Sequence, residues 1–271
     1  MRLGVCSYAF SWAIGVPGYE PPPEPMTAHE LLDRAAALGV RVVQIADNLP
    51  LDRLSDGEVD SLARRAAALD IEIEAGARGC RPDYLLNYLR IARRLNSRIL
   101  RMVADSAGDE PSPDEIVARL SGLVKPLEEA GVTLAIENHD RFRARQLREI
   151  VERLGSERVG VCLDTANSFG ALEGPDAVAE TLGPQVVNLH VKDVVVRRMS
   201  HNLGFVIEGR PAGQGQLDIP GLLSHLRNAG RDPNAILELW LAPEATMAAT
   251  IEREAVWAAE SVAYLRQLIP D

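Results

Sequence analysis

Short apolar stretches recur along the chain, and each is bounded by glycine, proline or polar residues that favour turns. Their short length and their many valine, isoleucine and leucine residues are typical of buried strands. On this pattern we predict eight strands, at residues 3–7, 42–46, 71–75, 98–103, 133–137, 160–164, 186–191 and 235–239.

The segments between these strands carry apolar residues with the spacing of an amphipathic helix. After Pro220, for example, Leu222, Leu223 and Leu226 form one stripe, and Gly230 then favours the end of the helix. Several segments begin with a capping box, in which a serine or threonine is followed three residues later by glutamate. The three boxes pair Thr27 with Glu30, Ser55 with Glu58 and Ser112 with Glu115.

Strand and helix thus alternate eight times, which is the pattern of a (β/α)8 barrel of the α/β class. No linker or change of composition marks a second domain, so we expect one TIM barrel domain over residues 1–271. The alternative is an open doubly wound sheet, which needs a glycine-rich turn directly after the first strand. Residues 6–10 contain no glycine, which favours the barrel. The proline-rich residues 17–25 are predicted to form an extended loop.

Composition and charge narrow the class of protein. With 46% hydrophobic and 25% charged residues, the chain can bury a large core. Its net charge of −10 would repel phosphate backbones and anionic lipids, so we expect no nucleic acid partner and no membrane partner. No apolar run approaches the roughly 20 residues of a membrane helix. The three cysteines lack metal-ligand spacing and indicate reduced thiols in a cytoplasmic protein.

The last four predicted strands each carry a potential metal ligand at or near their carboxyl ends. Glu137 ends the fifth strand and Asp164 the sixth, while His190 and Glu238 lie near the ends of the seventh and eighth. In a (β/α)8 barrel these strand ends meet at one rim. Each acid taken alone is also explained by a helix cap or an arginine partner. Three carboxylates gathered together would repel each other unless a cation lies between them, so their convergence favours a divalent metal.

The donor set indicates which ion this would be. Oxygen ligands with one imidazole and no thiolate suit Mn²⁺ or Mg²⁺, and Co²⁺ or Zn²⁺ also fit such a set. An ion chelated by a substrate carbonyl and the adjacent hydroxyl makes the C–H bond between them acidic, because it stabilises the enediolate. A neighbouring carboxylate can then remove the proton.

These strand ends resemble the metal-ligand segments of the xylose isomerase-like TIM barrel superfamily, the sugar phosphate isomerase/epimerase family. The order of the four residues, with steps of 27, 26 and 48 positions, is specific for the superfamily but not for a substrate. By this resemblance Glu137, Asp164, His190 and Glu238 bind one divalent metal, and Glu137 and Glu238 also form the catalytic acid/base pair. The four segments are Ala-Ile-Glu-Asn-His at residues 135–139, Cys-Leu-Asp-Thr-Ala-Asn at 162–167, Asn-Leu-His-Val-Lys-Asp at 188–193 and Ile-Leu-Glu-Leu-Trp at 236–240.

The resemblance implies a metal-dependent isomerase or epimerase that acts on a keto-sugar or sugar-acid through a metal-stabilised enediolate. Alternatives on the same scaffold are a lyase, either a decarboxylase of a 3-oxo sugar acid or a dehydratase, and a binding or structural subunit that retains the barrel. Endonuclease IV belongs to the same superfamily, but five histidines are few for its multi-zinc cluster and the negative charge disfavours DNA. Because many relatives form homodimers or homotetramers, we expect such an assembly here.

Two residues that follow a predicted ligand by two positions are candidates for substrate contact. Lys192 follows His190 and His139 follows Glu137, and each lies on the same face as its ligand if the strand continues. For Lys192 the alternative is an ion pair with a neighbouring carboxylate such as Asp193 or Glu208.

The resemblance supplies further substrate-binding candidates. Arg210 lies in the long glycine-bearing loop at residues 194–218, and Trp12 and Tyr19 resemble aromatic lid residues. Asn167 stands where many epimerases have a histidine, which weakens the case for a phosphorylated sugar or a simple ketose. The segment 197–215 also differs from the ketose epimerases and is closer to members that act on keto-acid sugars, including a decarboxylase of 3-oxo sugar acids.

Overall fold

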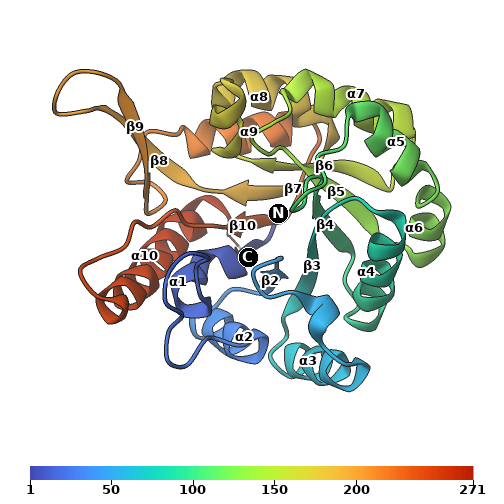
Figure 1. The fold of residues 1–271 in the computed structure, drawn as a ribbon, viewed down its shortest axis with the longest axis horizontal. Coiled ribbons are helices and arrows are strands. Elements are labelled where there is room, and N and C mark those ends of the chain that lie inside the picture. Colours follow the sequence, from blue (N-terminus) through green and yellow to red (C-terminus); the bar gives the residue numbers. More distant parts are fainter. Residues whose placement is uncertain (271) are drawn as a thin grey trace.

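The computed structural model describes residues 1–270 and contains a closed barrel of eight parallel strands surrounded by helices (Figure 1). The strands pair in the order β1-β10-β7-β6-β5-β4-β3-β2. This confirms the predicted (β/α)8 TIM barrel and excludes the open doubly wound sheet. The barrel strands are β1 (Leu3–Cys6), β2 (Val42–Ile45), β3 (Glu72–Arg78), β4 (Ile99–Val103), β5 (Thr133–Glu137), β6 (Val159–Asp164), β7 (Val186–Val191) and β10 (Ala235–Leu237).

The three predicted capping boxes are present at helix N-termini. In each, the serine or threonine side chain accepts a hydrogen bond from the glutamate backbone, and the glutamate carboxylate accepts one from the capping residue. These bonds satisfy N–H groups that the first helical turn leaves unpaired. The helices are α1 (Ser11–Ile14), α2 (Ala28–Ala37), α3 (Asp56–Ala68), α4 (Pro82–Arg94), α5 (Pro113–Ser121), α6 (Val124–Ala130), α7 (Ala144–Leu154), α8 (Pro175–Leu182), α9 (Ile219–Asn228) and α10 (Met247–Leu268).

Apolar side chains fill the space between the barrel and its helices. Helix α4, for example, buries Leu85, Tyr88 and Ile91 on one face. The barrel strands are buried on both faces, as expected when helices cover a parallel sheet. The largest error in the predicted strand boundaries is in β3, which continues to Arg78, beyond residue 75. None of the helices in the described part of the chain combines the length and apolarity of a membrane span.

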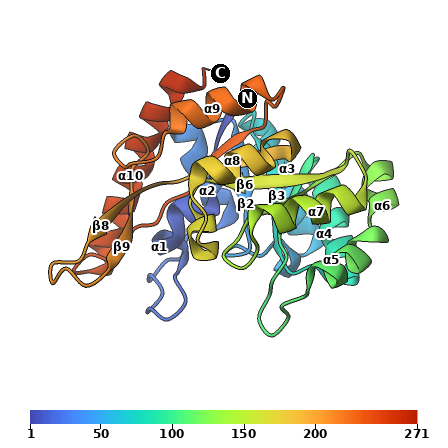
Figure 2. The same ribbon diagram turned by 90° about the horizontal axis from the view of Figure 1, so that it is seen from above.

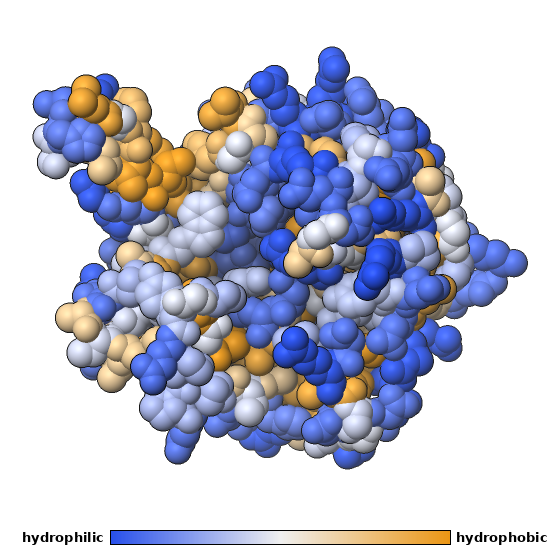
Figure 3. Space-filling view, in the orientation of Figure 1, coloured by the Kyte–Doolittle hydropathy of each residue, from blue (hydrophilic) through white to orange (hydrophobic). Residues whose placement is uncertain are grey.

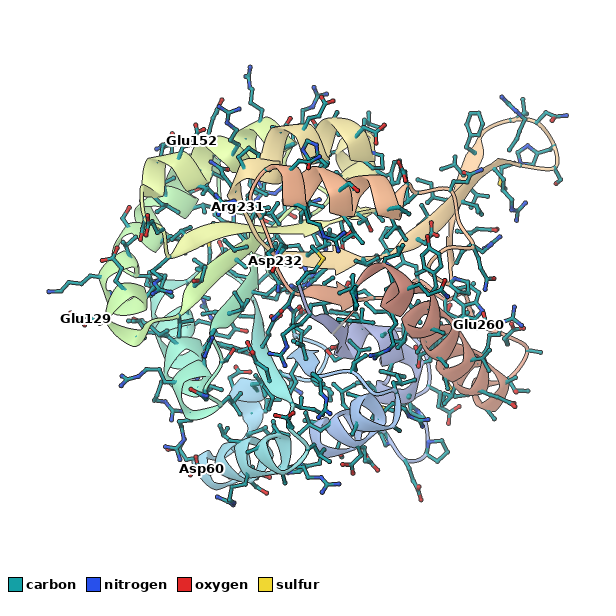
Figure 4. All side chains as sticks on the ribbon, turned by 180° about the vertical axis from the view of Figure 1, so that it is seen from behind. Asp60, Glu129, Glu152, Arg231, Asp232 and Glu260 are labelled. Atoms are coloured by element: carbon teal, nitrogen blue, oxygen red, sulfur yellow. The ribbon has the colours of Figure 1, made fainter. Side chains whose placement is uncertain are left out.

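The two ends of the barrel differ. Figure 2 shows both chain termini at one end and the loop at residues 17–25 at the other, which is the end where the strands finish. Figure 4 gives the view of the terminal end, with Asp232 near its middle. There the amino group of Met1 lies 2.6 Å from Asp232 Oδ2. The opposite end is therefore the one that carries the candidate ligands.

A two-stranded antiparallel arm projects from the barrel beyond β7 (Figure 1). It consists of β8 (Asp193–Arg198) and β9 (Phe205–Arg210), which pair from Asp193↔Arg210 to Arg198↔Phe205. The sequence prediction of a loop at residues 194–218 was therefore wrong for this part. Only a glycine fits at Gly209, because a Cβ atom there would lie 1.9 Å from the carbonyl oxygen of Trp240.

Candidate metal centre

The four predicted ligands lie together at the carboxyl end of the barrel. Glu137 and Asp164 are the last residues of β5 and β6, His190 lies within β7, and Glu238 directly follows β10. Their side chains point inward and all four are buried. The chain order of these strands matches their order around this part of the barrel, so four consecutive strand ends contribute to one cluster.

The imidazole of His190 is the centre of this cluster. Its Nδ1 atom lies 3.2 Å from Glu238 Oε1, 3.5 Å from Glu137 Oε2 and 3.7 Å from Asp164 Oδ2. Ligand atoms of Asp164, His190 and Glu238 all lie within 4.8 Å of one another. The arrangement thus brings three carboxylates around one ring nitrogen.

Two atoms of this cluster are buried without a hydrogen-bond partner among the described residues: His190 Nδ1 and Glu238 Oε1. The other ring nitrogen, Nε2, lies 2.7 Å from Gln44 Oε1, and since an amide oxygen can only accept, Nε2 carries the proton. The lone pair on Nδ1 of the neutral ring then faces the carboxylates. Buried polar atoms without partners are rare, and a lone pair beside carboxylate oxygens fits a divalent cation.

The electrostatics of the cluster favour a positive charge at His190. Burial alone would lower the pKa of His190, but Glu238 and Glu137 outweigh it and raise that pKa above its ordinary value. Burial would raise the pKa of Asp164, but Lys192 and His190 hold it well below its usual range. Either a proton on His190 or a metal ion beside it would therefore supply the positive charge that these carboxylates favour.

Lys192 contributes a buried ammonium group to the cluster. Its Nζ atom contacts Asp164 Oδ2 and lies 2.7 Å from Glu238 Oε2. These carboxylates outweigh the effect of burial and raise the pKa of Lys192, so the group stays charged. Asp193, one of the expected alternative partners, instead accepts hydrogen bonds from the backbone of Gly213 and Gly215.

Glu208, the other expected alternative partner of Lys192, pairs within the arm. It binds Arg197, and its Oε2 atom lies 3.0 Å from Arg210 Nη2. Lys192 therefore belongs to the metal-ligand cluster rather than to either of those pairs.

Arg101 is a second buried cation, and the sequence analysis did not identify it. Its side chain is 2% exposed, its Nε atom contacts Glu137 Oε2, and its Nη1 atom lies 2.9 Å from Asp47 Oδ1. Asp47 in turn pairs with Arg78 at 2.8 Å. The sequence did contain a sign of this role, since Arg101 lies in the middle of the apolar strand 98–103. A charged side chain on a strand that is buried on both faces requires a partner.

Two further candidates lie at different depths. The Nδ2 atom of Asn167 donates to Glu137 Oε1 over 2.8 Å, so this residue is part of the cluster. His139 lies on the rim, where its Nδ1 atom is 3.3 Å from Asp140 Oδ2 and its Nε2 atom is 3.5 Å from Arg78 Nη2. Neither of these polar contacts is with one of the four predicted ligands.

A cavity of about 790 Å³ opens over the cluster, and Trp12, Arg210, Lys192 and Glu238 are among its lining residues. Trp12 is buried, and its indole N–H donates to the carbonyl oxygen of Leu241 over 2.9 Å. Tyr19, which is 52% exposed, contacts Trp12 edge-on with ring centroids 4.8 Å apart. Trp12 is thus a wall of the cavity, whereas Tyr19 lies outside it.

Fold and site together define the class of protein. A profile of the family described as xylose isomerase-like TIM barrel matches residues 32–268. The chain therefore belongs to the xylose isomerase-like TIM barrel family, as its strand ends had suggested.

One relative is similar over almost the whole chain and another over 75% of it. The 3-oxo-isoapionate decarboxylase of Pectobacterium atrosepticum is 34% identical over 265 residues, which cover 98% of this chain and 95% of that protein. The uncharacterized protein YihM of Escherichia coli is 24% identical over 208 residues, which cover 75% of this chain and 63% of that protein.

Solved structures show the same fold at low sequence identity. D-psicose 3-epimerase, solved in the presence of D-fructose, has a TM-score of 0.75 at 15% identity, with 100% of both chains covered. A xylose isomerase-like TIM barrel protein from Mycobacterium smegmatis, solved in complex with magnesium, has a TM-score of 0.68 at 14% identity, with 97% of both chains covered.

Proposed function

We propose that this protein is a divalent-metal-dependent lyase that decarboxylates a 3-oxo sugar acid. The relative that is 34% identical over nearly the full length bears the name of such a decarboxylase. The proposal places the metal between Glu137, Asp164, His190 and Glu238, with Mn²⁺ or Mg²⁺ as the ion. The unpartnered Nδ1 atom of His190 and the surrounding carboxylates support this assignment.

The observation that favours decarboxylation is the pairing of both candidate bases with buried cations. Glu137 contacts Arg101 and Glu238 contacts Lys192. Burial would raise the pKa of Glu238, but His190 and Lys192 lower it to about 2. Held in this way, Glu238 is a poor proton acceptor. Decarboxylation needs no base, whereas epimerisation and isomerisation do.

In the proposed reaction the bond between C1 and C2 of the 3-oxo acid breaks and CO₂ leaves. The electron pair of that bond moves into the C2–C3 bond, and the C3 carbonyl becomes an enolate. One proton is then added to C2, which gives a ketone one carbon shorter. A divalent ion at the centre supplies Lewis acidity that favours electron density on the carbonyl oxygen.

The protein's own groups hold the substrate and supply the proton. Lys192, which lines the cavity, donates that proton from its ammonium group, and Glu238 Oε2, 2.7 Å from Nζ, holds the group in place. Arg101 and Asn167 fix Glu137 in its orientation. Arg210 lies at the cavity wall, where its guanidinium can bind a hydroxyl or carboxylate of the sugar acid.

Epimerisation or isomerisation of a keto-sugar is the second candidate. It is favoured by the placement of Glu137 and Glu238, whose oxygens approach His190 Nδ1 from two different strands. A proton removed by one of them and returned by the other would invert a carbon.

The experiment is turnover of 3-oxo-isoapionate by the purified protein, followed by CO₂ release and by NMR in D₂O. We expect CO₂ and a product with one deuterium at the carbon that lost the carboxylate. Loss of activity with EDTA and its return with Mn²⁺ would support the metal. If the protein instead exchanges deuterium into ketoses such as D-psicose without releasing CO₂, the epimerase is the correct assignment.

A further inference from the structure

A buried polar network lies beneath the candidate metal centre, on the side away from the cavity. Gln44 in β2 and Glu74 in β3 are directly paired in the barrel register, so both side chains enter the barrel interior. Asn188 lies two residues before His190 on β7 and shares its face. All four of these residues are 0% exposed.

Glu74 is an acceptor for three amide groups. Its Oε2 atom accepts from Gln44 Nε2 at 3.0 Å and from Asn188 Nδ2 at 2.9 Å, while Oε1 accepts from Asn234 Nδ2 at 2.8 Å. All three of these partners are donors, so a proton on Glu74 would find no acceptor among them. Burial raises the pKa of Glu74, but the three amides oppose this effect and stabilise the carboxylate form.

This network fixes the amide of Gln44. Its Nε2 atom donates both hydrogens, one to Glu74 Oε2 and one to Asn188 Oδ1, the latter also over 3.0 Å. A reversed amide would place its oxygen against two other acceptors in a buried site, which costs the hydrogen bonds and adds repulsion. The oxygen of Gln44 must therefore point the other way, toward His190.

The orientation of Gln44 decides which nitrogen of His190 carries the proton. Gln44 Oε1 lies 2.7 Å from His190 Nε2 and can only accept, so the proton is on Nε2. We propose that Glu74, acting through Gln44, is a positioning residue that holds His190 in the tautomer whose Nδ1 lone pair faces the metal centre. The inference rests on the metal site of the proposed function, but the tautomer itself can be measured without metal.

The first test is Glu74→Gln, examined by Mn²⁺ titration calorimetry on metal-stripped protein and by NMR of the imidazole nitrogens. An amide at residue 74 can donate as well as accept, so Gln44 is free to reverse. We expect Mn²⁺ affinity to fall about 10- to 100-fold. In metal-free protein, at a pH where the ring is neutral, we expect the His190 proton to be divided between Nε2 and Nδ1.

A rescue variant tests the same point if Glu74→Gln does not fold. In the double variant Gln44→Glu with Glu74→Gln, the carboxylate next to His190 still accepts from Nε2–H, and the amide at residue 74 can donate to it. We expect the Nε2 tautomer and Mn²⁺ affinity within about 10-fold of the original. A folded double variant with the proton on Nδ1, or without Mn²⁺ affinity, overturns the proposal.

Ser97→Ala serves as the control for general loss of stability. Ser97 is buried beside β3, and among residues 1–270 its hydroxyl bonds only the backbone of Ala75 and Ile99. We expect lower stability with unchanged Mn²⁺ affinity. Unchanged affinity and tautomer in Glu74→Gln would contradict the proposal. If the unaltered protein binds no Mn²⁺ while the ring proton still depends on Glu74, the metal-dependent function fails but the positioning role stands.

Discussion

Two buried cations, Lys192 and Arg101, occupy positions next to the carboxylates that were predicted to bind metal. Buried charge is costly unless it is paired, and each of these side chains has two carboxylate partners. The pairing means that Glu137 and Glu238 have different neighbours. They are therefore expected to respond differently to the same substitution.

The glutamate variants separate the two candidate reactions. For decarboxylation, Glu238→Gln should lower turnover about 10²- to 10⁴-fold because it removes the carboxylate that holds the proton-donating Lys192 ammonium in place. Glu137→Gln should retain a rate within about 10-fold, since no proton needs to be removed. Steady-state CO₂ release at saturating Mn²⁺ measures both. Equal, large losses in the two variants would favour an acid/base pair and hence epimerisation.

Lys192 competes with a metal ion for the same carboxylates. In Lys192→Gln the positive charge beside Asp164 and Glu238 is lost, so we expect Mn²⁺ to bind about 10- to 100-fold more tightly. Turnover should nevertheless fall, because the proton source is gone. Calorimetry with Mn²⁺ alone measures the affinity. A weaker affinity would show that Lys192 supports the metal site instead of opposing it.

The four metal-ligand candidates could be found from the sequence because each lies at or near the carboxyl end of an apolar strand. Arg101, Gln44 and Glu74 could not be placed in the same way. They lie inside strands, and the sequence pattern does not show which face of a fully buried strand points into the barrel. Their roles depend on contacts between different strands.

Among the elements, the arm is the part that the pattern analysis missed. The valines at 194–196 and the apolar residues 205–207 are strand-like, but each run is short and lies next to charged residues. The eight barrel strands were predictable because they are apolar throughout. The lid role expected for Trp12 and Tyr19 stays a prediction.

Helix α10 is connected to the segment that carries Trp12 by a buried carboxylate. Glu254 accepts hydrogen bonds from the backbone N–H groups of Trp12, at 2.9 Å, and Ala13, at 3.1 Å. Burial raises the pKa of Glu254 to about 7 despite these two bonds, which lower it. Between its ordinary pKa and about 7, the folded protein binds a proton that the unfolded chain has released.

This pKa shift predicts the sign of a pH effect on stability. The contribution of Glu254 to the free energy of unfolding should decrease as pH rises from about 4.5 to about 7, and then stay constant. Glu254→Gln should remove that part of the pH dependence. Urea denaturation at a series of pH values measures it, with exposed Glu252→Gln on the same helix as control. An unchanged slope in Glu254→Gln would contradict the assignment.

At the scale of the whole molecule, the arm presents an uncovered apolar face. Phe205 is 64% and Leu203 82% exposed, and Figure 3 shows apolar surface gathered on the arm. Residues 194–210 contain three arginines and one glutamate, whereas the chain as a whole carries a net charge of −10. We therefore propose a second copy of this acidic chain as the complementary partner, which would give the homodimer or homotetramer expected from the sequence.

Analytical ultracentrifugation tests this assembly. We expect an oligomer that dissociates when Leu203 and Phe205 are both replaced by serine, because the apolar contact is lost. Val256→Ser is the matched control, since Val256 is an exposed apolar residue on α10 and lies outside the arm. A monomeric native protein, or an oligomer that survives the arm substitutions, would contradict the prediction.

The central claim is that Glu137, Asp164, His190 and Glu238 form one divalent-metal centre. Crystals grown with Mn²⁺ and measured for anomalous scattering test it most directly. We expect a single strong peak among the four side chains, with His190 Nδ1 and carboxylate oxygens at about 2.0 to 2.3 Å. A peak elsewhere, coordination through His190 Nε2, or no peak with Lys192 still bound to Asp164 and Glu238 would contradict the account.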